Sequence, residues 1–302
     1  MRSQARSAGG VPSPATGTGL VIAAAVLWSS GGLIVRLLQG VDSWTIVFWR
    51  SVAACLFLAL FGLWSQGLAY LRAFSRLSLA SLAIALCFVV ASISLVVALK
   101  LTTVADVLIL MSCSPLLAAL LGRVALGERL GGLGWIALAS TIAGAAIMVS
   151  DSYARGSLAG DLIALCIALA QAVAIVLFRK HRDVSMVPAV NLAMLIAALI
   201  VAPLASFEPI AARSAGLIGF FGAGQLGLGL ALYATGAPLI PAAQTAMLGV
   251  LEPVIGPIWV WLALGERPTQ AGLIGGAIVI GAMGLFAFNG IRPHANSGRN
   301  RR

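Results

Sequence analysis

The chain has 302 residues, of which 61% are hydrophobic and only 9% are charged, far fewer than the roughly 25% charged residues of an ordinary soluble domain. A water-soluble fold is excluded, because its surface could not cover so much apolar material. The formal net charge of +10 does not indicate nucleic-acid binding, because the basic residues gather in the tails and in short connections between apolar segments.

Ten apolar segments are long enough to cross the membrane, since a spanning helix needs about 20 apolar residues. They are apolar on nearly every side and lack the alternation of barrel strands, which favours helices. The first segment is as long as a full span and is followed by no small-residue cleavage site, so it is interpreted as a retained helix. In chain order the predicted spans are 19–38, 44–64, 77–99, 104–122, 131–150, 158–178, 186–206, 214–235, 242–264 and 269–288.

The distribution of basic residues predicts the orientation of these spans. With a cytoplasmic N-terminus, thirteen of the nineteen Lys and Arg residues fall on the inner side and two fall within spans, at Arg36 and Arg50. The four on the outer side are Lys100, Arg155, Arg213 and Arg267. This positive-inside bias predicts a multi-pass protein of the plasma (inner) membrane with both termini in the cytoplasm. Residues 1–17 and the basic residues 291–302 are interpreted as cytoplasmic tails, the second able to contact anionic membrane lipid.

Metal and cofactor chemistry are not expected. The two histidines, His181 and His294, lie in a basic loop and in the tail, and no P-loop sequence is present. The cysteines fall within spans without the close spacing of metal ligands, and are interpreted as small packing residues: Cys55, Cys87, Cys113 and Cys166. A glycine match at Gly222, Gly224 and Gly227 lies inside an apolar span and follows no strand, so it predicts close helix packing rather than dinucleotide binding.

An internal repeat divides the chain into two halves. A shift of 138 residues places Pro115 on Pro253 and the run Leu126–Arg129 on Leu264–Arg267, including a Glu-Arg pair in a chain with few charged residues. Each half, 18–150 and 157–290, holds five spans, and an odd number of crossings inserts the second half in the opposite orientation. The predicted fold is therefore an all-α membrane protein of about ten transmembrane helices in two inverted five-helix repeats. Such repeats can open a central site alternately to each side.

These motifs resemble the EamA branch of the drug/metabolite transporter superfamily over roughly residues 17–290. Each domain of that family ends in a pattern like Pro followed by Leu-Gly-Glu-Arg and a final span, and Phe48–Ser51 and Leu27–Gly32 are similar to its second and first helices. The resemblance implies transport of metabolites, amino acids or drugs, commonly as export. The first half departs from the second, because Ser114 precedes Pro115 where Glu252 precedes Pro253.

Glu252 is the sharpest candidate for a functional residue. It lies about ten residues into its span, roughly 15 Å deep, where a carboxylate must face protein or a water-filled cavity. Substrate binding and proton coupling are both open to it, as is a purely structural role with hydrogen bonds to neighbouring helices. Pro115 and Pro253 are predicted hinges of the fourth and ninth spans, with a static bend as the alternative.

Three more residues complete the predicted site. Arg50 lies roughly 9 Å below the outer surface and either pairs with Glu252, binds an anionic solute group, joins two helices or extends outward to the interface. Trp28 lies away from the interfacial aromatic belt and is a candidate for a cavity wall, or for plain packing. Gln225 is a candidate for a polar pocket, whereas Gln171, Asn191, Tyr233 and Gln244 are left outside the site. Arg36, Asp106 and Asp161 are predicted at the interface near the outer helix ends.

The sequence thus predicts a secondary transporter that moves a small organic solute by alternating access, in the direction of export. A non-transporting scaffold or receptor is the alternative, but it would be expected to carry a larger extramembrane domain. An intramembrane enzyme is less favoured because no HExxH, Gly-x-Ser-x-Gly or paired intramembrane Asp motif is present. The expected partners are the solute and membrane lipid, and a homodimer is left open.

Overall fold

The computed structural model describes residues 13–75, 78–128, 130–182 and 184–291, and every regular element within them is helical. Arg129, His294, most of the predicted N-terminal tail and all but the first residue of the basic tail lie outside the described residues. Within them, ten helical stretches are long and apolar enough to cross a membrane: Pro14–Leu37, Ser43–Gln66, Leu79–Leu101, Val104–Leu126, Gly132–Arg155, Leu158–Lys180, Met186–Leu204, Ala212–Leu239, Gln244–Leu264 and Gln270–Ala287. The prediction of an all-α fold with ten spans is confirmed.

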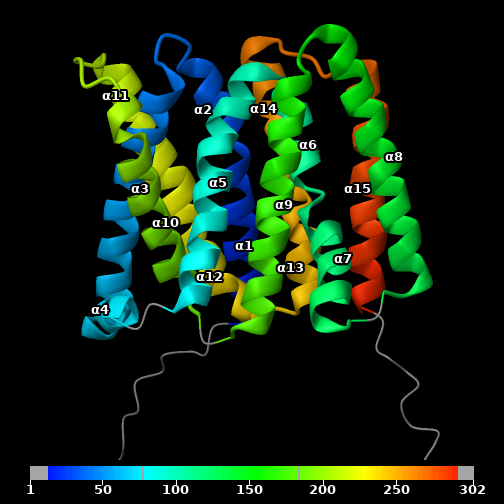
Figure 1. The fold of residues 1–302 in the computed structure, drawn as a ribbon, viewed down its shortest axis with the longest axis horizontal. Helices are drawn as coiled ribbons and strands as arrows, with labels where there is room; N and C mark the ends of the chain where they lie inside the picture. Colours follow the sequence, from blue (N-terminus) through cyan, green and yellow to red (C-terminus); the bar gives the residue numbers. More distant parts are fainter. Residues whose placement is uncertain (1–12, 76–77, 129, 183, 292–302) are drawn as a thin grey trace, which may run out of the picture.

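The spans stand side by side in one bundle (Figure 1), and several are interrupted. The elements are α1 (Pro14–Ser29), α2 (Gly31–Leu37), α3 (Ser43–Gln66), α4 (Leu68–Ser75), α5 (Leu79–Leu101), α6 (Val104–Met111), α7 (Ser114–Leu126), α8 (Gly132–Arg155), α9 (Leu158–Lys180), α10 (Met186–Val201), η1 (Ala202–Leu204), α11 (Ala212–Gly219), η2 (Phe220–Leu228), α12 (Gly229–Gly236), η3 (Ala237–Leu239), α13 (Ala242–Gly249), α14 (Leu251–Leu264) and α15 (Gln270–Ile291). We call the end of the bundle that carries α2 and α11 in Figure 1 the upper end, and the end that carries α4 the lower end.

The repeated Leu-Gly-Glu motif has a local structural role in each half. Gly127 and Gly265 adopt left-handed backbones, with φ of 69° and 71°, directly after α7 and α14. A residue without a Cβ ends a helix in this conformation at little cost. The glutamate that follows each glycine is thereby placed at a bundle end, Glu128 at the lower end and Glu266 at the upper end.

The two repeats interlock. The most extensive helix pairs each join one helix from each half: α8 with α15, α5 with α9, and α3 with α10. On the first of these pairs a Cβ added at Gly144 would lie 2.7 Å from the carbonyl oxygen of Gly275, so only glycine allows this approach. The core between the halves is therefore shared.

The fourth and ninth spans are both interrupted, at positions related by the repeat. The fourth breaks between α6 and α7 at Ser112–Cys113, and the ninth between α13 and α14 at Val250. Pro115 and Pro253 follow within the first turn of the second segment, where a missing N–H breaks no helical hydrogen bond. Both prolines thus lie beside real interruptions of their spans, just past the break rather than at it.

Candidate functional site

Two connected cavities lie at the centre of the bundle. The inner cavity, of about 180 Å³, is lined by all four residues predicted as substrate-binding, namely Trp28, Arg50, Gln225 and Glu252. The vestibule, of about 660 Å³, shares Trp28 and Glu252 with it, includes both predicted hinge prolines, and extends to Arg179 and Pro238 at the lower end. The structure therefore brings all six predicted residues around one connected space.

Glu252 borders both cavities. It is the second residue of α14, directly after the interruption of the ninth span, and an acidic residue in the first turn of a helix is favoured by the helix dipole. It is half-buried, and no hydrogen bond or ion pair joins its side chain to another residue in the part of the chain that the structure describes. A carboxylate held in the middle of a membrane bundle without a protein partner is chemically free to bind a cationic group or a proton.

Arg50 faces the same space but does not pair with Glu252. Its side chain is 2% exposed and donates from Nη1 to Oγ of Ser92 at 2.9 Å and to the Ser92 carbonyl oxygen at 3.4 Å. The guanidinium carbon lies 4.3 Å from the centre of the Phe221 ring, a cation–π distance. Its buried Nε has no hydrogen-bond acceptor among the described residues. Outward extension to the interface is thus ruled out, and one donor of the fork remains unused.

Trp28 and Gln225 are joined across the two halves. Nε2 of Gln225 donates to the carbonyl oxygen of Trp28 at 2.9 Å, near the end of α1. Gln225 lies in η2, a π-helical segment, and such segments are rare and frequent at functional sites. Two buried polar atoms here, Nε1 of Trp28 and Oε1 of Gln225, lack a partner within the described residues. Both residues line the inner cavity, so an unpaired donor and an unpaired acceptor belong to its walls.

The glycines of η2 explain how it reaches this position. A Cβ at Gly222 would collide with the carbonyl oxygen of Arg50 on α3. The prediction that the glycine-rich run serves close helix packing is confirmed.

Among the neutral polar residues left outside the predicted site, two belong to the cavity. Gln171 lines both spaces and Tyr233 lines the vestibule, with its ring 5.3 Å from that of Trp28. Asn191 instead hydrogen-bonds Tyr70, and Gln244 donates to Thr18 at 3.0 Å. No sequence signal separates these pairs, because a polar side chain in a span serves a pocket or a helix contact equally well.

The upper end is closed by a polar network between the repeats. Arg36 holds Glu266 with two donors, Nε to Oε2 at 2.7 Å and Nη2 to Oε1 at 3.2 Å, and also donates to the carbonyl oxygens of Leu99 and Thr102. Oε1 of Glu266 further accepts the N–H of Val104, the first residue of α6, at 3.0 Å. Glu266 comes from the second repeat and its partners from the first, so the network ties the halves together.

Two aspartates extend this network. Asp161 accepts from Thr102 at 2.8 Å, and Asp106 accepts from Thr103 at 2.7 Å and from Arg155 at 3.1 Å. Both side chains are buried. Both lie in the first turns of their helices, at the level predicted from the sequence, and the surrounding hydroxyl and guanidinium groups allow their side chains to be enclosed by protein.

The lower end carries the counterpart of the upper ion pair. Glu128, the repeat-related partner of Glu266, accepts from Nη1 of Arg179 at 2.9 Å. Arg179 lies near the end of the first helix of the second half, as Arg36 does in the first half. Here the pair is about 40% exposed and rests on this single contact among the described residues. In the sequence these glutamates stand out only as marks of the repeat, and their pairing is not predicted.

Comparisons with known proteins agree with this architecture. The model of the EamA-like transporter family matches residues 15–150 and 158–288. A crystal structure with 19% sequence identity superimposes with a TM-score of 0.68, covering 93% of this chain and 100% of the other, which shows a shared fold. No curated protein matches the sequence. Since the family model covers nearly all of both repeats, the chain is a multi-pass membrane protein that belongs to the EamA-like transporter family.

Proposed function

We propose that the chain is a secondary transporter of a small organic solute that contacts Glu252, Arg50, Trp28 and Gln225. The observation that carries this proposal is the partner-free carboxylate of Glu252 in a cavity between the two repeats. The unused Nε of Arg50 supplies a cationic group on the same space. A solute with an amino group, including a zwitterionic amino acid, matches this pair of charges.

The two ends support alternating access. In this conformation the upper network is closed, while the vestibule reaches the lower end past the single Arg179–Glu128 contact. Because the glutamates of these ion pairs are related by the repeat and each meets an arginine of the first helix of a half, exchange of conformation between the halves would loosen one pair as it strengthens the other. The interruptions beside Pro115 and Pro253 give each half a place to bend.

The proposed orientation places the lower end in the cytoplasm of a cell with the protein in its plasma (inner) membrane. Arg72, Arg123, Arg179, Lys180 and Arg182 lie at or beside the lower ends of the described helices, and the sequence assigns thirteen of the nineteen Lys and Arg residues to this side. The upper end carries Lys100, Arg155, Arg213 and Arg267, so the positive-inside rule favours a cytoplasmic lower end. Export is the proposed direction, as the resemblance to the family implies, and the vestibule open to the cytoplasm is then the loading state.

The test is a melting-temperature screen of the purified protein against amino acids, nucleobases, sugars and cationic drugs, because a ligand that binds the folded state stabilises it. A hit should then drive counterflow in proteoliposomes. Stabilisation by no member of these classes, together with absent counterflow, would contradict the proposal.

A further inference from the structure

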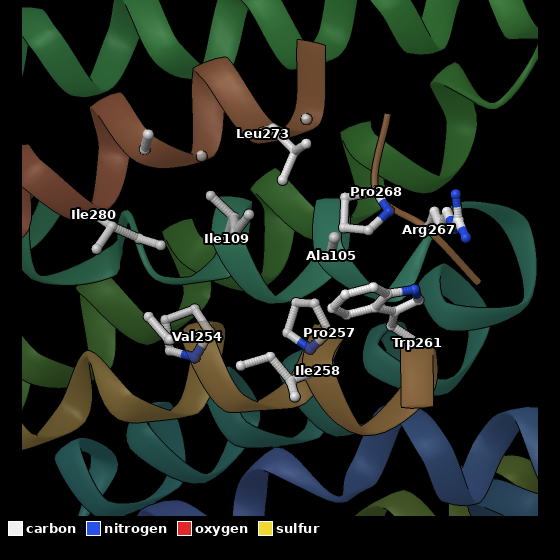
Figure 2. A pocket seen from close by; sticks show the side chains of 14 residues that line it. Ala105, Ile109, Val254, Pro257, Ile258, Trp261, Arg267, Pro268, Leu273 and Ile280 are labelled. Carbon is white, nitrogen blue, oxygen red and sulfur yellow. The ribbon is translucent and has the colours of Figure 1, made fainter. Parts of the chain in front are cut away.

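A lateral groove lies on the outside of the bundle, between α14 and α15, with α6 as its floor (Figure 2). Its volume is about 580 Å³, within the roughly 300–1,000 Å³ of small-molecule sites. Val254, Ile258 and Trp261 on α14 are 39%, 43% and 48% exposed, although they lie within a membrane span. The medium in contact with such a face is lipid hydrocarbon.

Small residues give the groove its depth. Gly276 and Ala277 on α15 carry little or no side chain, and a Cβ at Gly276 would lie 2.6 Å from Cδ1 of Ile109 on α6. The floor is thus closed by direct contact of these two helices. A helix of another protein, with a diameter of about 10–12 Å, would rest on the rims, whereas a flexible hydrocarbon chain can enter.

One charged residue stands at the upper end of this otherwise apolar lining. Arg267 is exposed, and no hydrogen bond or ion pair engages its guanidinium in the described part of the chain. The adjacent carboxylate cannot neutralise it, because Glu266 is held by Arg36. Arg267 follows α14 at the level where a spanning helix leaves the hydrocarbon, and Trp261 lies in the last turn of that helix.

We propose that the lateral groove is a phospholipid site, with an acyl chain along α14 and α15 and the lipid phosphate on Arg267. A planar guanidinium with several donors suits a phosphate, and basic pockets between spanning helices recognise lipid head groups. The occupant is distinct from the transported solute, because α14 separates the groove from the central cavities. Pro253 borders both the groove and the vestibule, so the lipid touches the rear of the helix whose start carries Glu252.

The experiment measures lipid binding by native mass spectrometry of the purified, delipidated protein in detergent. The probes are dioleoyl phosphatidylglycerol and dioleoylglycerol, which has the same chains and no phosphate. The first should bind more tightly to the wild-type protein. Arg267→Ala should weaken phosphatidylglycerol binding about fivefold, the effect of roughly one favourable charge at a membrane surface. Ala277→Phe should block the chain sterically and weaken both probes.

Matched controls keep the result specific. Arg213→Ala removes an exposed upper-end arginine outside the groove, and Ile274→Phe adds the same bulk at an exposed position of α15 that does not line the groove. Both should bind lipid like the wild-type protein, with melting temperatures showing that all four variants are folded. The proposal would be overturned if Arg267→Ala and Arg213→Ala weakened phosphatidylglycerol binding equally, or if the wild-type protein bound the two probes with equal affinity. It would also be overturned if the mass spectra showed a dimer of the chain without bound lipid, unchanged by added lipid. Binding is read without solute, so the outcome is independent of the proposed transport.

Discussion

Each end of the bundle carries one glutamate of the repeated motif, but the interactions of this glutamate with the other half are stronger at the upper end than at the lower end. At the upper end Glu266 receives two donors from Arg36 and the N–H of Val104, in a half-buried network that continues to buried aspartates. At the lower end Glu128 receives one exposed contact from Arg179. Exposed ion pairs contribute about 0.2–1 kcal/mol, whereas hydrogen bonds to charged groups in partly buried sites contribute about 1.5–3 kcal/mol. The difference indicates that in this conformation the two halves are held together firmly at the upper end and weakly at the lower end.

The largest expected effect follows from the open path between the lower end and Glu252. Glu252→Gln keeps the shape of the side chain but removes its charge, so solute counterflow in proteoliposomes should be abolished. The control Glu208→Gln, in an exposed position after η1, should transport normally. If folded and inserted Glu252→Gln transported solute at the wild-type rate, Glu252 would not be the group that binds the solute at the end of the vestibule.

The upper network is broken by Glu266→Gln. The change removes the charge that two Arg36 donors engage, so the population open at the upper end should rise about tenfold or more. The measurement is labelling of Gln171→Cys, placed in the cavity of a chain without native cysteines, by an impermeant maleimide added to the upper side. Unchanged labelling would mean that the network is not a lock.

A smaller effect is expected in the cavity between the two ends. Arg50→Lys keeps the charge near Ser92 but loses the planar fork, so the half-saturating solute concentration should rise about fivefold. Arg72→Lys, on a short helix at the lower end, is the matched control. Unchanged affinity in Arg50→Lys would leave Arg50 a structural role beside Phe221 and Ser92.

The smallest effect should come from Glu128→Gln, the repeat-related twin of Glu266→Gln. Because the substitution removes one exposed contact, labelling of Gln171→Cys by a maleimide added to the lower side should change by no more than about two- to threefold. This substitution and its twin are chemically identical, so each controls the other. Similar effects at both ends would remove the asymmetry inferred from the contacts.

The sequence could predict much of the site because charge inside a membrane is costly wherever it lies. Glu252 and Arg50 were recognisable from depth alone, and they do line one cavity. Whether they pair with each other could not be predicted from the sequence, and they do not, because Arg50 contacts Ser92 and Phe221 instead. Both Gln171 and Asn191 were left outside the predicted site, although only Gln171 lines the cavity. The sequence does not show whether a polar residue in a span faces a cavity or a neighbouring helix.

The sequence by itself determined the ten spans and the inverted repeat, because the hydrocarbon core dictates segment length and an odd number of crossings reverses the second half. The tertiary structure alone decided how the halves interlock, which glutamate pairs strongly, and where polar atoms remain free. These properties depend on contacts between residues far apart in the chain, such as Arg36 with Glu266 and Gln225 with Trp28. Local hydropathy and spacing carry no information about such contacts.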